Sequence, residues 1–249
     1  MLCNKKTKLG LCVLTSLLIL TGYKGEAKEI KTEVIKAKTV IKYKEFNIPQ
    51  HEFTDNVIKD AYVFEYDGFK ITQPYKKSSK QTLTHKKVAE EFQKLPKVLK
   101  ENVKEIQLLD YNNIEDVYWA DILDMEDFKS YAVGGYKQIC FYANDYLSIE
   151  LNNSLVVSTL IHESAHNFDE AMSSINDRYS NSKEWILTMS DDLDIKDNGY
   201  GLYCSKYAKD ASSSLEDFAE AITQYVVNKD KFAKEYPNRA NKINELFNK

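Results

Sequence analysis

The sequence predicts an α+β fold, with a small mixed sheet followed by a mainly helical C-terminal part. Short stretches rich in aromatic and β-branched residues, which are typical of strands, lie before residue 145. Apolar residues recur with helical spacing over most of the chain after residue 153. Because the strands and helices are segregated along the chain instead of alternating, their order is that of the α+β class.

Residues 1–27 predict a secretory signal peptide. Three lysines precede an apolar run from Leu9 to about Leu20, and a polar stretch with small residues allows cleavage after Ala27. The apolar run is too short to span a bilayer comfortably, so an uncleaved membrane anchor is the weaker alternative. We therefore expect Gram-positive-type export of a secreted protein, with no stable membrane association after cleavage of the leader.

The composition of the mature chain excludes several classes of partner and site. Removing residues 1–27 takes away four lysines and one glutamate, which changes the formal net charge from −4 to −7. An acidic exported protein is a poor binder of nucleic acid, whose phosphates require basic patches. Cys140 and Cys204 remain after cleavage, and whether they form a disulfide outside the cell stays open. Since there is no CxxC pattern, a cysteine-based zinc site is not expected.

Residues 28–85 form an N-terminal extension of unknown role. Aromatic and β-branched residues flank Asp67 and Gly68, a pair that predicts a hairpin turn between two short strands. The segment 73–87 is polar and basic, as in a linker. A pro-region, a small β-subdomain and an exported tail are all compatible with this composition.

Residues 86–249 predict one compact domain. We expect a helix over 86–103 that is interrupted at Pro96, and strands over 105–111 and 116–123. The pair Gly134-Gly135 predicts a turn that leads into a strand over 138–143. The remaining elements are helical, and they cover about 154–172, 182–193 and 212–249, with a break near Pro237 in the last.

The helix over 154–172 contains "HESAH", an HExxH pattern. His162 and His166 are four residues apart, so both imidazoles can reach one point beside the helix. Zn²⁺ binds imidazole nitrogens, and Glu163 next to the first of them can reach a zinc-activated water as a general base. A neighbouring stripe is apolar and is expected to face the core; it consists of Ile161, Ala165, Phe168 and Met172.

A catalytic zinc site needs a third protein ligand, and the C-terminal helices offer two candidates. Glu216 and Glu220 lie four apart on one face of the predicted helix, opposite an apolar face. Geometry alone allows either glutamate to bind zinc, and the other can then orient a ligand histidine, as Asp169 can. Ser213 and Glu216 also fit a capping box, in which Glu216 only caps the helix.

The stretches "LIHESAHNFDEA", "SKEWILTM" and "LEDFAEAI" resemble the gluzincin metallopeptidases related to the anthrax lethal factor catalytic domain and to the Pro-Pro endopeptidases. The resemblance covers roughly residues 86–249 and implies a zincin-like fold with one Zn²⁺ per chain. It favours Glu216 over Glu220 as the third ligand. By this resemblance the site comprises the zinc ligands His162, His166 and Glu216, the general base Glu163, and the orienting carboxylates Glu220 and Asp169.

The family also has a tyrosine shortly before the glutamate ligand, which helps to stabilise the oxyanion. Tyr207 is the closest match here, although its spacing to Glu216 is slightly longer than is usual, and Tyr203 is the alternative. Ala165 stands where the family commonly has glycine, a change between two small residues that we expect to be harmless.

These residues predict a secreted zinc endopeptidase that hydrolyses peptide bonds with a zinc-activated water and a glutamate general base. The resemblance implies an extended peptide or protein substrate that adds itself to an edge strand, for which 134–144 is the candidate stretch. The alternative is a catalytically inactive zincin-fold module that serves binding or accompanies a toxin. Substrate specificity and oligomeric state have no signal in the sequence.

Overall fold

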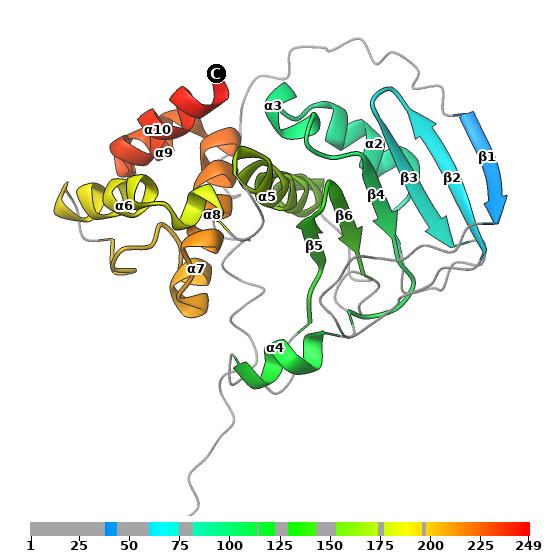
Figure 1. Cartoon of the computed structure of the whole chain (residues 1–249), viewed down its shortest axis with the longest axis horizontal. Coiled ribbons are helices and arrows are strands. Elements are labelled where there is room, and N and C mark those ends of the chain that lie inside the picture. The colour runs from blue at the N-terminus through cyan, green and yellow to red at the C-terminus, as the bar shows by residue number, and fades with distance from the viewer. Residues whose placement is uncertain are drawn as a thin grey trace, which may run out of the picture.

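The computed structural model describes residues 38–43, 60–74, 82–113, 115–122, 129–142, 153–173, 177–195 and 198–249. Within these ranges a mixed, six-stranded sheet stands beside a group of helices (Figure 1). The expected α+β class with a small mixed sheet and a mainly helical C-terminal part is confirmed. The signal peptide predicted over 1–27 lies outside the described residues.

The sheet has the strand order β1-β2-β3-β4-β6-β5. Strands β1 to β3 are antiparallel, β4 runs parallel to both β3 and β6, and β5 returns antiparallel to β6. The strand at the end of the sheet beside the long helix is therefore β5, and β6 is internal (Figure 1). The strands are β1 (Lys38–Tyr43), β2 (Asp60–Tyr66), β3 (Phe69–Pro74), β4 (Glu105–Leu108), β5 (Ala132–Gly135) and β6 (Gln138–Phe141).

The sheet extends across the boundary predicted between residues 85 and 86. Strand β3 lies in the N-terminal extension, yet it pairs in parallel with β4, with Ile71 opposite Ile106. Both side chains are fully buried in one hydrophobic core. The hairpin predicted at Asp67 and Gly68 is confirmed, because β2 and β3 pair up to that two-residue turn and Gly68 has a φ of 82°.

The turn predicted at Gly134 and Gly135 is wrong by two residues. Both glycines belong to β5, and Gly135 pairs with Gln138 of β6. The turn is made by Tyr136 and Lys137, which have φ values of 53° and 62°. A two-residue hairpin turn with positive φ at both positions usually contains glycine or asparagine. The glycines therefore serve a purpose other than this turn.

The helices before residue 173 include one that the sequence reading assigned to a strand. Helices α2 (His85–Gln93) and α3 (Lys97–Lys100) are separated at Pro96, as predicted. Residues Asp116–Ile122 form helix α4, so the strand predicted over 116–123 is wrong. Val117 of this helix is exposed. The long helix α5 (Asn153–Met172) matches the prediction closely.

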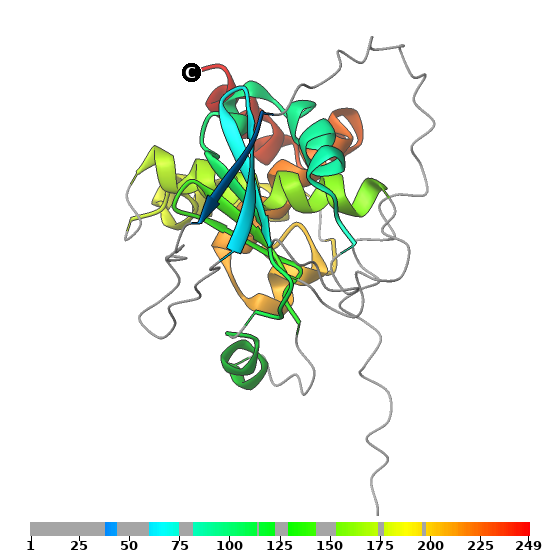
Figure 2. The same ribbon diagram turned by 90° about the vertical axis from the view of Figure 1, so that its right-hand side faces the viewer.

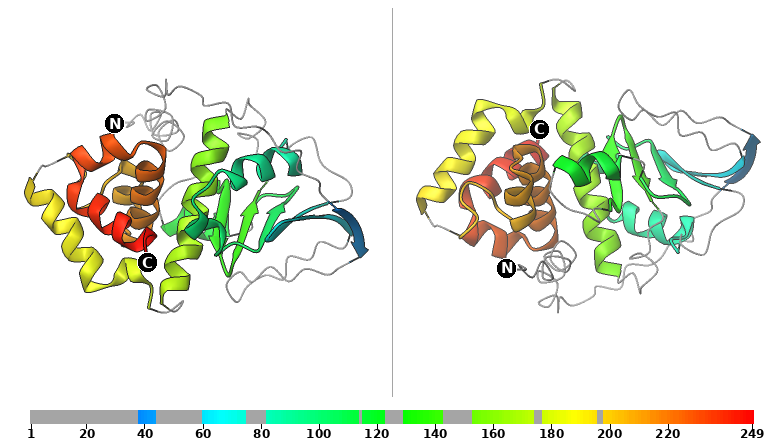
Figure 3. Two further views of the ribbon diagram at one scale, coloured as in Figure 1. Left: turned by 90° about the horizontal axis from the view of Figure 1, so that it is seen from above. Right: turned by 90° about the horizontal axis from the view of Figure 1, so that it is seen from below.

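Helix α5 lies between the sheet and the C-terminal helices, as the views along the vertical direction show (Figure 3). Helices α2 and α3 pack beside it over the sheet (Figure 2). The predicted apolar stripe of α5 faces the core. No described helix is both long and apolar enough to cross a membrane. The C-terminal elements are the 3-10 helix η2 (Tyr179–Asn181), α6 (Lys183–Ile195), α7 (Lys206–Ala211), α8 (Ser214–Val227), α9 (Lys229–Glu235) and α10 (Pro237–Phe247).

Candidate metal centre

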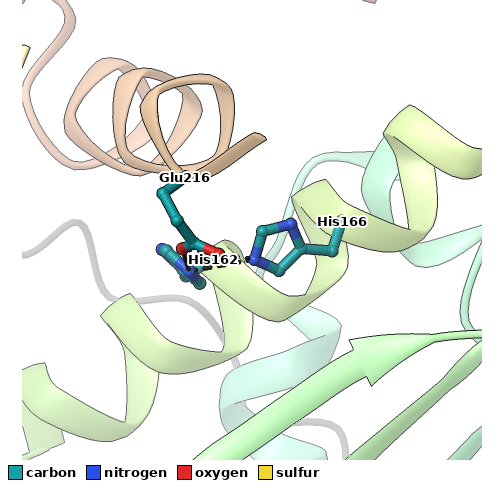
Figure 4. Close-up of side chains that lie close together, drawn as sticks. All are labelled: His162, His166 and Glu216. Carbon is teal, nitrogen blue, oxygen red and sulfur yellow. Dashed lines mark hydrogen bonds and ion pairs between the residues drawn. The ribbon is translucent and has the colours of Figure 1, made fainter. Parts of the chain in front are cut away.

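Two histidines of α5 and one glutamate of α8 point to a common centre (Figure 4). The Nε2 atom of His162 lies 3.1 Å from Nε2 of His166 and 3.1 Å from Oε2 of Glu216. The third side of this triangle, from His166 Nε2 to Glu216 Oε2, measures 3.6 Å. The three side chains are largely buried, with Glu216 the most exposed at 18%.

The triangle fits a tetrahedral zinc ion. Ligand atoms about 2.0–2.1 Å from tetrahedral zinc lie about 3.3 Å from one another, which is close to all three distances observed. Two imidazoles and one carboxylate are also the donor types that catalytic zinc sites use. Nitrogen and oxygen lone pairs that face each other so closely require a cation or a shared proton between them.

The protonation of the histidine nearest the carboxylates reflects this requirement. Burial lowers the pKa of His162, but its hydrogen bonds to Glu216 and Glu220 outweigh burial and raise the pKa well above its ordinary value. Burial likewise raises the pKa of Glu216, whereas the charge of His166 and the hydrogen bonds from both imidazoles lower it, and the net pKa is strongly lowered. The site therefore favours a negative carboxylate beside a positive charge.

The structure distinguishes the roles of the two glutamates of α8. Glu216 contacts the Nε2 atoms that face the centre, while Glu220 lies at the other nitrogen of the His162 ring. A carboxylate that accepts a hydrogen bond from Nδ1 fixes the proton there and leaves the Nε2 lone pair to a metal. Glu220 thus lies within hydrogen-bond distance of the ring nitrogen that faces away from the centre.

Local geometry at the start of α8 frees the Glu216 carboxylate. The hydroxyl of Ser213 accepts a hydrogen bond from the Glu216 backbone N–H at 3.3 Å, which is one half of a capping box. The other half is absent, because the Ser213 N–H donates to the carbonyl of Ala208 and the Glu216 carboxylate faces the histidines. The capping motif that offered an alternative explanation for Glu216 is therefore only half formed.

Glu163 is buried next to His162, with 7% of its surface exposed. Burial raises the pKa of its carboxyl, while the charges of His162 and His166 and a backbone hydrogen bond from Gly134 lower it, and the net pKa is raised. A carboxyl group whose pKa is raised toward neutrality is suited to accept and return a proton.

Tyr207 on α7 lies near His162. Its ring centroid is 6.0 Å from that of His162, and the side chain is 36% exposed. Ser205 caps the short helix that carries it, since the Ser205 hydroxyl accepts a hydrogen bond from the Ala208 N–H. Tyr203, the alternative, packs against the hydrophobic core. Of the two tyrosines, the structure brings Tyr207 to the site.

Asp169 does not orient a ligand histidine through a hydrogen bond. Its buried carboxylate accepts hydrogen bonds from the backbone N–H and the hydroxyl of Ser180, at 2.8 and 2.6 Å. Nδ1 of His166 has no hydrogen-bond partner among the described residues. The expected hydrogen bond from a ligand histidine to Asp169 is thus wrong. Asp169 lies one turn after His166 on α5, and its side chain contacts η2 instead. In turn, Asn181 of η2 accepts a hydrogen bond from Ser214 at the start of α8.

Sequence reasoning missed a buried ionic cluster that begins at Asp217, the residue after Glu216. Asp217 follows Glu216, and its carboxylate lies 3.1 Å from Nε of Arg239 on α10. Arg239 is 1% exposed, and its Nη1 is 3.0 Å from Asp192 of α6. One signal was present, because Arg239 shares the buried stripe of α10 with Ile243. The cluster joins three helices directly behind Glu216.

The two cysteines whose pairing was left open are both free. Cys140 on β6 and Cys204 before α7 are buried as separate thiols, and burial raises the pKa of each. A thiol with a raised pKa is seldom present as the reactive thiolate.

Comparisons with known proteins add no family assignment. The sequence matches no protein-family model, and it matches no curated protein significantly. The resemblance described above therefore rests on the motifs themselves.

Proposed function

We propose that this chain is a secreted zinc-dependent endopeptidase of the gluzincin type. The observation that carries the proposal is the triangle formed by His162, His166 and Glu216, whose sides match the ligand spacing of tetrahedral zinc. Among the described residues three side chains converge on this point, which supports a catalytic site with an open position, since structural zinc sites are closed by four protein ligands.

Each of the other site residues has a role in peptide hydrolysis. Zinc bound by the three ligands would supply a Lewis acid and lower the pKa of a bound water to about 7. Glu163 accepts the proton of the attacking water and returns it to the leaving amine. Tyr207 donates a hydrogen bond to the oxyanion that forms at the scissile carbonyl.

An extended segment of peptide or protein is the proposed substrate. The sheet ends at β5, the strand that packs against α5 next to the metal ligands. Outer backbone groups of an end strand can pair with an added peptide strand. The stretch predicted as this edge is only partly suitable, because β6 is internal to the sheet and β5 is the end strand.

The proposal is tested by metal analysis and peptide cleavage with the purified protein. We expect one zinc per chain, loss of cleavage on chelation, and recovery when zinc is added back. Glu163→Gln should keep the zinc and lose about 10²–10⁴-fold in kcat. Zinc binding by a protein that cleaves no member of a diverse peptide library would instead support the alternative, an inactive binding or toxin-accessory module.

A further inference from the structure

Strand β5 touches α5 at the proposed general base, and a glycine makes this contact possible. A Cβ atom built on Gly134 would lie 2.3 Å from the backbone carbonyl oxygen of Glu163 and 2.9 Å from its Cα. Real Cβ atoms essentially never come so close to another heavy atom. The neighbouring Gly135 is different, because its Cβ would meet only the Glu170 carboxylate, at an ordinary 3.6 Å.

Further contacts fasten the β5–β6 hairpin to the same side of α5. The side-chain amide of Asn167 donates to the Gln138 carbonyl at 2.8 Å and to the Glu163 carbonyl at 3.0 Å. One turn later, Glu170 accepts a hydrogen bond from the backbone N–H of Tyr136 at 2.7 Å. Residues 163, 167 and 170 recur at helical spacing, so one row of α5 carries every one of these contacts.

We infer that Gly134 is a positioning residue for Glu163: its missing side chain lets the β5–β6 hairpin seat directly on α5 and fix the carboxylate beside the metal ligands. The backbone hydrogen bond from Gly134 to the Glu163 carboxylate acts at the same point. This inference rests on the proposed function. It also explains why a glycine stands at position 134 within the strand and not in the turn.

A matched pair of variants tests the inference. Gly134→Ala and Gly135→Ala add the same methyl group to adjacent residues of the same strand. Only the first meets the backbone of Glu163. We expect Gly134→Ala to show a kcat about 10²-fold below that of Gly135→Ala, because a misplacement of about 1 Å costs that much. The KM and the zinc content should be similar in the two variants.

Crystal structures of the two zinc-loaded variants give a readout that does not depend on activity. In Gly134→Ala we expect the hairpin to move away from α5 and the Glu163 carboxylate to leave its place, whereas in Gly135→Ala both should stay. Equal kcat values, or a Glu163 carboxylate in the same place in both structures, would overturn the inference. If the wild-type protein cleaves no peptide, the proposed function fails, and the crystal structures still decide whether Gly134 positions Glu163.

Asn167→Ala provides a second variant in case Gly134→Ala does not fold. It removes the amide that holds the Gln138 carbonyl without introducing a clash. We expect kcat to fall by more than several-fold but by no more than about 10²-fold, the cost of a misplacement of about 1 Å. The KM and the zinc content should stay unchanged. A kcat equal to that of the wild type would show that the hairpin does not position the base.

Discussion

The carboxylate of Glu220 lies 3.1 Å from Nδ1 of His162, on the opposite side of the ring from the Nε2 atom that faces Glu216. One imidazole thus bridges two carboxylates that are one helical turn apart on α8. In the proposed site, one carboxylate is a zinc ligand and the other orients the ring.

Removing the Glu220 carboxylate should weaken zinc binding. We expect Glu220→Ala to lower zinc affinity by about 10–100-fold, because the His162 ring loses the partner that orients it. Competition titration with a chelator of known affinity measures the change. Glu245→Ala is the control, since Glu245 lies on α10 and pairs with Lys242. Equal zinc affinities in the two variants would contradict the orienting role.

Replacing Tyr207 should slow catalysis without loss of metal. Tyr207→Phe removes the hydroxyl that we assign to the oxyanion, and we expect kcat to fall by about 10²–10³-fold while zinc stays bound. Tyr203→Phe makes the same chemical change in a side chain that packs on the core. Steady-state kinetics of both variants decide between the tyrosines, and a larger loss in Tyr203→Phe would reverse the assignment.

Replacing Asp169 should affect stability more than metal binding. Asp169→Ala leaves the buried N–H and hydroxyl of Ser180 without their acceptor. We expect the free energy of unfolding to fall by about 2 kcal/mol, measured by urea denaturation of the metal-free protein. Ser180→Ala removes one of these two hydrogen bonds and should cost less. Weak zinc binding by a fully stable Asp169→Ala variant would restore the role that the resemblance implies.

The stability of the fold should depend on pH through Glu91. Burial raises the pKa of Glu91, but hydrogen bonds from Lys87 and Lys94 outweigh it and hold the pKa below its ordinary value. A carboxyl group whose pKa is lower in the folded state stabilises the fold above its unfolded pKa, and this contribution disappears as the pH falls through the folded pKa. Glu91→Gln should therefore reduce the free energy of unfolding by about 1 kcal/mol at neutral pH and have no effect in acid. A deficit that is independent of pH would show that packing, not charge, is responsible.

The two thiols should be unreactive in the folded protein. In a chain that lacks residues 1–27, we expect Ellman's reagent to modify Cys140 and Cys204 only after unfolding, because both are buried and their pKa values are raised. Mass spectrometry of the intact secreted protein checks the pairing. A mass lower by two hydrogens would reveal a disulfide and contradict the separate thiols.

The sequence contains enough information to place the two histidines, because helical spacing is a local property. Their positions on α5 and the buried stripe beside them follow from residue order alone. The choice between Glu216 and Glu220 is different, because four residues of separation put both carboxylates on one face. It depends on how α8 approaches α5, which is a property of the tertiary structure.

The features that the sequence did not predict correctly at the site also depend on tertiary structure. Asp169 has the helical spacing to reach His162 and His166, but its carboxylate accepts a hydrogen bond from Ser180 of η2 instead. The local sequence does not indicate that contact. The glycines of β5 suggested a turn because glycine is common in turns, whereas a close approach to Glu163 is what requires Gly134. Burial of Arg239 against two aspartates likewise depends on three helices that are distant in the chain.

The position of Arg239 has a consequence for the order in which the site is assembled. During synthesis the two histidines leave the ribosome long before α10 is complete. Asp217 directly follows Glu216, and its charge is compensated only when Arg239 is in place. A nascent or proteolytically shortened chain that stops before residue 239 would carry all three zinc ligands and an uncompensated buried carboxylate next to the last of them, which is strongly destabilising. Residues 239–249 are thus needed to stabilise the site, and a fragment without them should bind metal incompletely.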